Sequence, residues 1–474
     1  MQDVVVISGG MVVTMDAQRR VLDRADLLVE RGRIAAIGEV AVPPGAQRID
    51  ASGMIVLPGL IDAHAHAGHS LVKTLGGGDS ARWTEAVEEI YPRGTTTAFW
   101  AADGALAALE RLKAGITTGL AVFGAYGSRT DAPDYAQAHA AAYRHVGVRL
   151  VICPGVSPPP YPNRFARWDG DAATPLAITL DDQLRVCEAL VGTLHGAADA
   201  MTHVMLAAPV AFPGRPGVTA ELLAGYADAA ISTRVLSRSL GVGFTQDGHR
   251  AGTVRVAAEQ GLLGPDALLS HCIDIDAEEQ AAIIASGAKV AHNPSANFSI
   301  LGRCPAIELM AAGGTVAICS DGTAPDRPFD LFRHMQQAMH YHRRHFRDAQ
   351  VLPPGKALEM VTIDAARALG LEAEIGSLEA GKRADIVLVD MQKPHLFPPD
   401  MPLYRLVCFA NAADVDTVLV EGRVVMSGRA VPHVDQRAVL ADAAREITAA
   451  IARSGMQRMS AMPDGFWRRT RYGA

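Results

Sequence analysis

The sequence predicts a mixed α/β protein: a closed (β/α)8 TIM barrel with a small β-sandwich domain formed by both chain ends. Three observations support this fold. Apolar strand-like runs alternate with helical patterns from about residue 58 to residue 371, as in repeated βα units around a parallel sheet. Eight such runs occur, the number that closes a barrel. Short strands rich in β-branched residues precede and follow this region.

The elements follow in order along the chain. Antiparallel strands separated by Gly or Asp turns are expected first, at Val4–Ile7, Met11–Met15, Asp26–Glu30 and Arg33–Ile37. The barrel strands are expected at Asp62–His66, Gly115–Val122, Arg149–Cys153, Val204–Ala207, Val242–Thr245, Ala267–His271, Lys289–His292 and Thr315–Ser320. Helical patterns lie between them, for example at Leu180–Leu194 and Glu221–Leu240. An open doubly wound sheet is the alternative, but no Gly-x-Gly-x-x-Gly follows a first strand.

Strand character returns after Gly376, in runs that can complete the N-terminal sheet: Ala384–Val389 and Val415–Val420. We therefore expect the β domain to comprise residues 1–57 and 376–430, with the barrel at 58–375. Residues 431–474 form a tail, which is helical by periodicity from about Asp435 to Ser454.

Composition excludes several classes of protein. The chain has 474 residues, of which 49% are hydrophobic and 20% charged, as in a globular enzyme rather than a disordered chain. The net charge of -7 argues against a nucleic-acid partner. No apolar run has membrane-spanning length, the first residues do not form a signal peptide, and the six Cys contain no C-x-x-C pair. We expect a cytoplasmic protein that acts on a small molecule.

The sharpest chemical feature is His64-Ala65-His66, at the end of the first barrel strand. Side chains at i and i+2 of a strand point the same way, so both imidazoles can reach one metal ion. Active sites of such barrels lie at the carboxyl ends of the strands, where this pair stands. The alternative is a pair of buried, hydrogen-bonded histidines.

The string Leu57-Pro-Gly-Leu-Ile-Asp-Ala-His-Ala-His66 resembles the opening signature of the amidohydrolase superfamily. Further segments resemble that superfamily in the same order: 112–119 at the second strand, Ala267–Cys272 with His271 at the sixth, Val290–Asn297 at the seventh, Ala317–Thr323 with Asp321 at the eighth, and 376–386 at the return into the flanking sheet. The resemblance covers about residues 1–430 and is closest to the deaminase and chlorohydrolase-type branch. Ser320–Asp326 and Met339–Phe346 are also similar to hydrolases of phenylureas and thiocarbamates such as molinate.

This resemblance implies one divalent metal ion per chain, with Zn as the first choice and Fe, Mn or Co as alternatives. It assigns His64, His66 and Asp321 as ligands. Asp321 would also act as general base, and His271 would hold the water or polarise the scissile group. A divalent metal makes hydroxide available at neutral pH. A homo-oligomer, a dimer in the first instance, is also implied.

The chain departs from the superfamily pattern at the fifth strand, where a His is usual, often as H-x-x-E. Here the segment reads Val242-Gly-Phe-Thr-Gln-Asp-Gly-His-Arg250. We favour His249 as the ligand. Asp247 is the second choice, Gln246 could merely line the site, and no ligand from this segment is the third possibility. The missing Glu argues against deamination of an aromatic ring, because that Glu passes a proton to the ring nitrogen.

We therefore predict a metal-dependent hydrolase that cleaves a C–N bond of an amide, urea or carbamate-type small molecule. The alternatives are a deaminase of an aminated heterocycle, guanine- or triazine-like, and a non-catalytic scaffold barrel. His292, Asn293 and Trp100 are the predicted substrate contacts.

Overall fold

The computed structural model describes residues 4–123, 129–214, 217–297 and 301–467. One sheet is the predicted barrel, with eight parallel strands in the order β15-β14-β13-β12-β11-β8-β7-β6. Its strands are β6 (Leu60–Asp62), β7 (Ile116–Phe123), β8 (Arg149–Pro154), β11 (Thr202–Ala208), β12 (Gly243–Gln246), β13 (Ala267–Ser270), β14 (Lys289–His292) and β15 (Val316–Ile318). The TIM-barrel prediction is confirmed.

The two ends of this sheet, β6 and β15, meet through the segments that follow them. Asp321 donates its backbone N–H to the His64 carbonyl at 3.1 Å. The Asp62 carboxylate accepts the backbone N–H of Ser320 at 2.9 Å and also the Ser320 hydroxyl. Closure of the barrel therefore brings the first and eighth strands together at their carboxyl ends.

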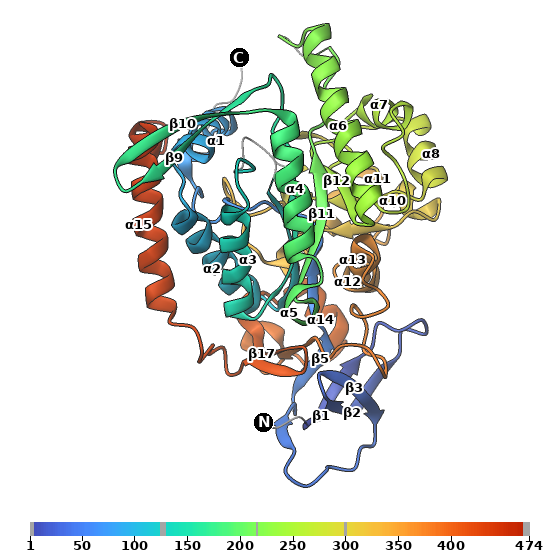
Figure 1. The fold of residues 1–474 in the computed structure, drawn as a ribbon. Coiled ribbons are helices and arrows are strands. Elements are labelled where there is room, and N and C mark those ends of the chain that lie inside the picture. The colour runs from blue at the N-terminus through green and yellow to red at the C-terminus, as the bar shows by residue number, and fades with distance from the viewer. Residues whose placement is uncertain (1–3, 124–128, 215–216, 298–300, 468–474) are drawn as a thin grey trace.

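Helices surround the barrel (Figure 1). They are α1 (Ser80–Gly94), α2 (Thr97–Lys113), α3 (Asp134–Val146), α4 (Leu180–Leu194), α5 (Ala197–Ala200), α6 (Ala220–Leu240), α7 (Thr253–Glu259), α8 (Ala277–Ser286), α9 (Pro294–Ala296), α10 (Ala306–Ala311), α11 (Leu331–Phe346), α12 (Pro354–Met360), α13 (Ile363–Leu369), α14 (Pro402–Phe409) and α15 (Gln436–Ser454). Short 3-10 turns lie at Leu75–Gly78, Pro394–Leu396, Ala412–Asp414 and Gln457–Ser460. Helix α15 packs along α1 and α2.

The second sheet joins the two chain ends below the barrel in Figure 1, in the order β18-β17-β16-β5-β1-β2-β3, with β4 paired to β1. Its strands are β1 (Val4–Val13), β2 (Val21–Glu30), β3 (Arg33–Gly38), β4 (Gln47–Asp50), β5 (Met54–Pro58), β16 (Ile386–Asp390), β17 (Val415–Val420) and β18 (Arg423–Met426). The two strands predicted at Val4–Ile7 and Met11–Met15 are one strand, because Gly9, with φ of 80°, forms a bulge instead of a turn.

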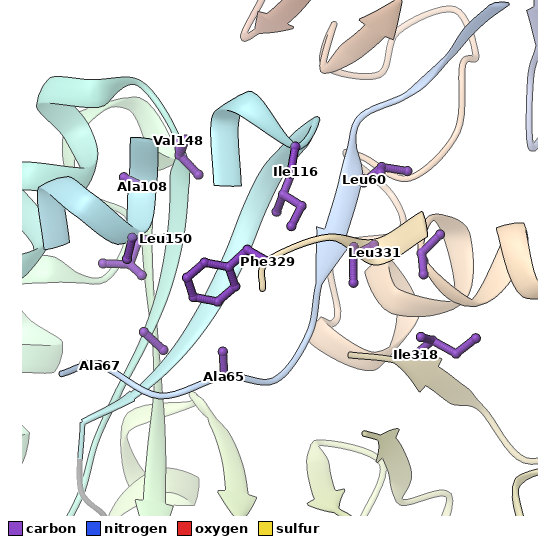
Figure 2. Close-up of a cluster of buried hydrophobic side chains, with 14 of the residues drawn as sticks. Leu60, Ala65, Ala67, Ala108, Ile116, Val148, Leu150, Ile318, Phe329 and Leu331 are labelled. Carbon is purple, nitrogen blue, oxygen red and sulfur yellow. The ribbon is translucent and has the colours of Figure 1, made fainter. Parts of the chain in front are cut away.

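One hairpin was not predicted: β9 (Asn163–Asp169) and β10 (Ala172–Ile178), inserted after β8 and packed against α1. The barrel interior is apolar, with small or branched side chains such as Ile61, Leu120, Val151 and Leu268. A larger cluster fills the space between strands and helices, where Phe329 packs near Ile116 and Leu150 (Figure 2). Within the described ranges, no helix has the length and hydropathy needed to cross a membrane.

Candidate metal centre and active site

The His64-Ala65-His66 segment lies just after the end of strand β6. Strand β6 ends at Asp62, earlier than predicted, but the chain stays extended beside β7: Val122 donates to the Ala65 carbonyl at 2.7 Å, and Ala67 donates to Val122 at 3.0 Å. Alternation sends Ala65 and Ala67 into the apolar cluster around Phe329 (Figure 2). The side chains of His64 and His66, which alternate with these two alanines, therefore face the opposite side, at the mouth of the barrel.

Four side chains converge there, from three parts of the barrel: His64, His66, Asp247 and Asp321. One ligand atom from each lies within 4.8 Å of all the others. His64 Nε2 is 3.2 Å from Asp247 Oδ1 and 3.5 Å from Asp321 Oδ1. His66 Nε2 is 3.2 Å from Asp247 Oδ2 and 3.3 Å from Asp321 Oδ1. Two imidazole nitrogens and two carboxylates thus surround one point.

Asp247, the second choice at the fifth strand, occupies the place predicted first for His249. His249 is fully buried and is not part of the cluster; its Nδ1 lies 3.0 Å from the Thr253 hydroxyl, and its backbone N–H is bound to the Ser270 carbonyl. Asp247 directly follows Gln246, the last residue of β12, and therefore points into the barrel mouth. The preference for His249 is corrected, since a turn at Gly248 separates it from the cluster.

His271 adjoins the cluster on its other side. Its Nε2 is 3.2 Å from Asp247 Oδ1 and 3.6 Å from Asp321 Oδ1, while Nδ1 lies 2.9 Å from Asn297 Oδ1. The carboxamide oxygen requires a proton on Nδ1, which orients Nε2 toward the carboxylates. Both His271 and Asp321 have positive φ, 69° and 63°, a backbone conformation that is uncommon in non-Gly residues and costs energy unless the surrounding structure holds it.

The electrostatics follow from burying acids and bases together. Burial raises the pKa of Asp247, but the His66 and His64 imidazoles outweigh it and hold that pKa well below its usual range. Burial likewise raises the pKa of Asp321, and His271 and Arg327 reverse the effect. In return, although burial lowers the pKa of His66, Asp247 and Asp321 raise it to about 9. The two carboxylates are held ionised and require positive charge beside them.

The residues fit a divalent cation. Both ring nitrogens of His64 are buried and make no hydrogen bond within the described residues, although Nε2 faces two carboxylates. Such an orphaned nitrogen is costly unless it ligates a metal. Neutral imidazoles and carboxylates are ordinary ligands of Zn, Fe, Mn and Co.

A small cavity of about 210 Å³ lies against this cluster. Its lining includes His69, Trp83 and Arg327, which are not among the site residues predicted from the sequence. The His69 ring stacks on His66 with centroids 4.5 Å apart, and Trp83 meets His69 edge-on at 5.0 Å. Arg327 Nη2 is 3.5 Å from Asp321 Oδ2. Two signals in the sequence could have pointed to this group: His69 stands three residues after His66, and Trp83 is an aromatic residue that could line an apolar wall.

A larger cavity of about 850 Å³ shares Thr84 and Asp247 with the small one. Its wall combines polar and charged side chains, among them Glu88 and Asn163, with proline and aromatic rings: Pro158, Pro159, Pro209, Pro213, Phe212 and Tyr226. Arg250, which follows the cluster, also lines it and lies over the Phe212 ring at 4.8 Å. The volume is in the range of small-molecule sites.

The three predicted substrate contacts lie elsewhere. Trp100 is fully buried among Tyr91, Phe99 and Phe123, and its Nε1 donates to the Thr95 hydroxyl at 3.2 Å. It belongs to the core, as an aromatic residue on an apolar helix face usually does.

His292 and Asn293 are also buried and line neither cavity. His292 Nε2 lies 3.2 Å from His342 Nε2, and Asn293 Nδ2 donates to the Ser270 hydroxyl at 3.3 Å. The substrate-contact prediction is corrected for both, because each side chain is fully buried against a neighbouring side chain and lines neither cavity. Asn293 instead supports it through Ser270, which donates its hydroxyl to Asp247 Oδ1.

The barrel, its flanking sheet and this cluster define a class: metal-dependent hydrolases of the TIM-barrel type. Residues 55–425 match the profile of the amidohydrolase family, and the chain belongs to that family. It is accordingly a metal-dependent hydrolase acting on carbon–nitrogen bonds other than peptide bonds.

Similar proteins extend over nearly the whole chain. A 5-methylthioadenosine/S-adenosylhomocysteine deaminase of Desulforudis audaxviator is 32% identical, covering 89% of this chain and 93% of its own length. A 5'-deoxyadenosine deaminase of Methanosarcina mazei is 28% identical, covering 95% and 99%.

Among solved structures, an adenosine deaminase of Xanthomonas campestris with bound zinc superposes with a TM-score of 0.79 at 22% identity, covering 94% of this chain and 98% of its own. An atrazine chlorohydrolase of Arthrobacter aurescens, complexed with zinc, gives 0.76 at 22%, covering 94% and 100%. These structures confirm the fold. The similarity to phenylurea and molinate hydrolases stays a prediction.

Proposed function

We propose that the protein is a hydrolytic deaminase of an aminated heterocycle, with adenine nucleosides as the first class to test. The observation that carries this is the full-length similarity, at 32% identity, to a relative named as a 5-methylthioadenosine/S-adenosylhomocysteine deaminase. The prediction made from the sequence ranked this second, behind amide, urea and carbamate hydrolysis. The relatives reverse that order.

The cavities are consistent with such a substrate. A planar heterocycle can lie beside the cluster, between Trp83 and Arg327. The rest of the molecule can occupy the larger cavity, whose proline and aromatic rings, together with polar side chains such as Glu88 and Asn163, suit a sugar-like group. Thr84 and Asp247 stand where the two cavities meet.

The reaction replaces an exocyclic amine by oxygen: water adds to the ring carbon, and the C–NH₂ bond breaks with release of ammonia. A divalent cation held by His64, His66, Asp247 and Asp321 would supply the Lewis acid that lowers the pKa of the attacking water. Asp321 is placed to accept that water's proton and pass it to the leaving amine, because its two oxygens face His271 and Arg327. His271, fixed by Asn297, orients the water and the developing alkoxide.

One observation keeps the amide, urea or carbamate hydrolase as the second candidate. In the described part of the chain, no Glu lines the small cavity beside the cluster. The residue three positions after Asp247 is Arg250. Ring deamination needs a proton on the ring nitrogen, whereas hydrolysis of a urea or carbamate requires one only on the leaving amine.

The test is ammonia release from adenosine, 5'-methylthioadenosine, 5'-deoxyadenosine, S-adenosylhomocysteine, guanine and an amino-triazine, by protein reconstituted with Zn²⁺ or Mn²⁺. Anilides, phenylureas and thiocarbamates are assayed in parallel for amine release. Turnover of at least one amino-heterocycle, abolished in Asp321→Asn, supports the proposal. Turnover confined to the second panel refutes it in favour of the second candidate.

A further inference from the structure

The fifth-strand carboxylate sets the chemistry of the cluster. We propose that Asp247, held by Ser270 and Asn293, makes this an oxygen-rich site that prefers the harder divalent cation Mn²⁺ more than a three-imidazole site on the same barrel would. The inference concerns which cation the site selects and does not depend on the proposed substrate.

The atoms that could bind a cation are two nitrogens and the oxygens of two carboxylates. Two imidazole nitrogens and two carboxylates converge, from His64, His66, Asp247 and Asp321. His249 stands two residues from Asp247 and could supply a third nitrogen, but its Nδ1 is engaged by Thr253 and it is not part of the cluster. Carboxylate oxygens are hard donors that suit Mn²⁺, whereas imidazole suits Zn²⁺ and the later transition metals.

The second step is the support of Asp247. Its Oδ1 accepts a hydrogen bond from the Ser270 hydroxyl, and that hydroxyl accepts one from Asn293 Nδ2 at 3.3 Å. Ser270 and Asn293 are fully buried, at the ends of the adjacent strands β13 and β14. This chain restricts rotation of the carboxylate and leaves Oδ2 toward His66. These hydrogen bonds orient the Asp247 carboxylate in the way that outer hydrogen bonds orient metal ligands.

The third step is charge. Two carboxylates and two neutral imidazoles carry a formal charge of about −2, which a divalent cation neutralises. With a third imidazole in place of Asp247, the set would carry about −1 and offer a softer donor. Replacing this residue therefore changes both the charge and the hardness of the site while leaving the barrel unchanged.

The experiment measures cation binding directly on the full-length protein, stripped by a chelator and titrated with Zn²⁺ or Mn²⁺. Zn²⁺ affinity is read by competition with a chromophoric chelator, and free Mn²⁺ by its electron paramagnetic resonance signal. Asp247→His should raise the ratio of Zn²⁺ to Mn²⁺ affinity by at least about tenfold. Ser270→Ala should weaken both affinities by about 10-fold or more, because the carboxylate is no longer held.

The matched control is His249→Asn, in the same turn, which should leave both affinities within about twofold of the wild type. If Asp247→His does not fold by circular dichroism, Asp247→Asn replaces it and should weaken Mn²⁺ more than Zn²⁺. An unchanged affinity ratio, or loss of the ion in His249→Asn, overturns the inference. Failure of deamination with the expected ratios would overturn the proposed function alone.

Discussion

Two clusters of buried charge lie at opposite ends of the barrel, and they are built differently. Beside the flanking sheet, Arg149 of β8 pairs with Asp385 and Glu421 and lies 3.1 Å from the Thr118 hydroxyl. At the other end, Asp247 and Asp321 face imidazoles, and both ring nitrogens of His64 lack a hydrogen bond within the described residues.

The two clusters differ in what neutralises their carboxylates. In the Arg149 cluster a permanent cation of the protein balances the acids, and Asp385 also accepts the Glu421 backbone N–H at 2.9 Å. That cluster ties the barrel to the sheet formed by the chain ends. In the other cluster the bases are imidazoles, which can lose a proton and bind a metal ion, so a metal ion can replace the positive charge that the carboxylates require.

The largest expected effect is on turnover. Asp321→Asn should reduce kcat/KM by about 10⁴-fold, because the change removes one carboxylate of the cluster and the group that we propose moves protons. Steady-state kinetics on the best substrate measures this, with urea unfolding to show an intact fold. Near wild-type turnover would remove Asp321 from the mechanism.

The second effect is on stability and belongs to the opposite cluster. Arg149→Leu should lower the free energy of unfolding by about 3–5 kcal/mol, because it leaves Asp385 buried and unpaired. Urea denaturation measures this. The double variant Arg149→Leu/Asp385→Leu is the control and should recover most of the loss. If the single variant cost less than the double, the pairing argument would fail.

The third effect is the contribution of a bound cation to the free energy of unfolding. Removing the cation with a chelator should lower the free energy of unfolding by about 3 kcal/mol relative to protein held at 100 times the dissociation constant. Calorimetry with and without added ion measures the shift. Chelation should leave the Arg149 cluster unaffected, so Arg149→Leu should cost the same amount in both conditions.

The smallest effect is a dependence on pH. Burial, with Arg149 nearby, lowers the pKa of His203 to about 4. As pH falls from about 6.5 toward 4, the unfolded chain binds a proton that the folded chain excludes, so stability falls, by about 2 kcal/mol for a partly exposed group. His203→Gln should flatten the unfolding free energy over this window by that amount. Identical pH profiles would contradict the shift.

Much of the fold was predictable because periodicity reports burial. The eight barrel runs and the helices at Leu180–Leu194 and Glu221–Leu240 match β and α elements within a few residues. The Gly9 bulge was misread because a glycine with positive φ serves turns and bulges alike. The β9–β10 hairpin was missed because its strands are mostly exposed and lack an apolar pattern.

The barrel and the family resemblance could be predicted from the sequence alone. So could His64, His66, His271 and Asp321 as candidate site residues, because each stands at the end of a predicted strand in a segment that resembles the family; the structure brings these four together. Only the tertiary structure shows that Asp247, and not His249, belongs to the cluster, because the residue types do not predict the direction of the turn at Gly248. It also placed His69, Trp83 and Arg327 around the site and moved Trp100, His292 and Asn293 out of it. Which side chains come into contact depends on loops that follow different strands, and a local sequence pattern does not predict the distances between such loops.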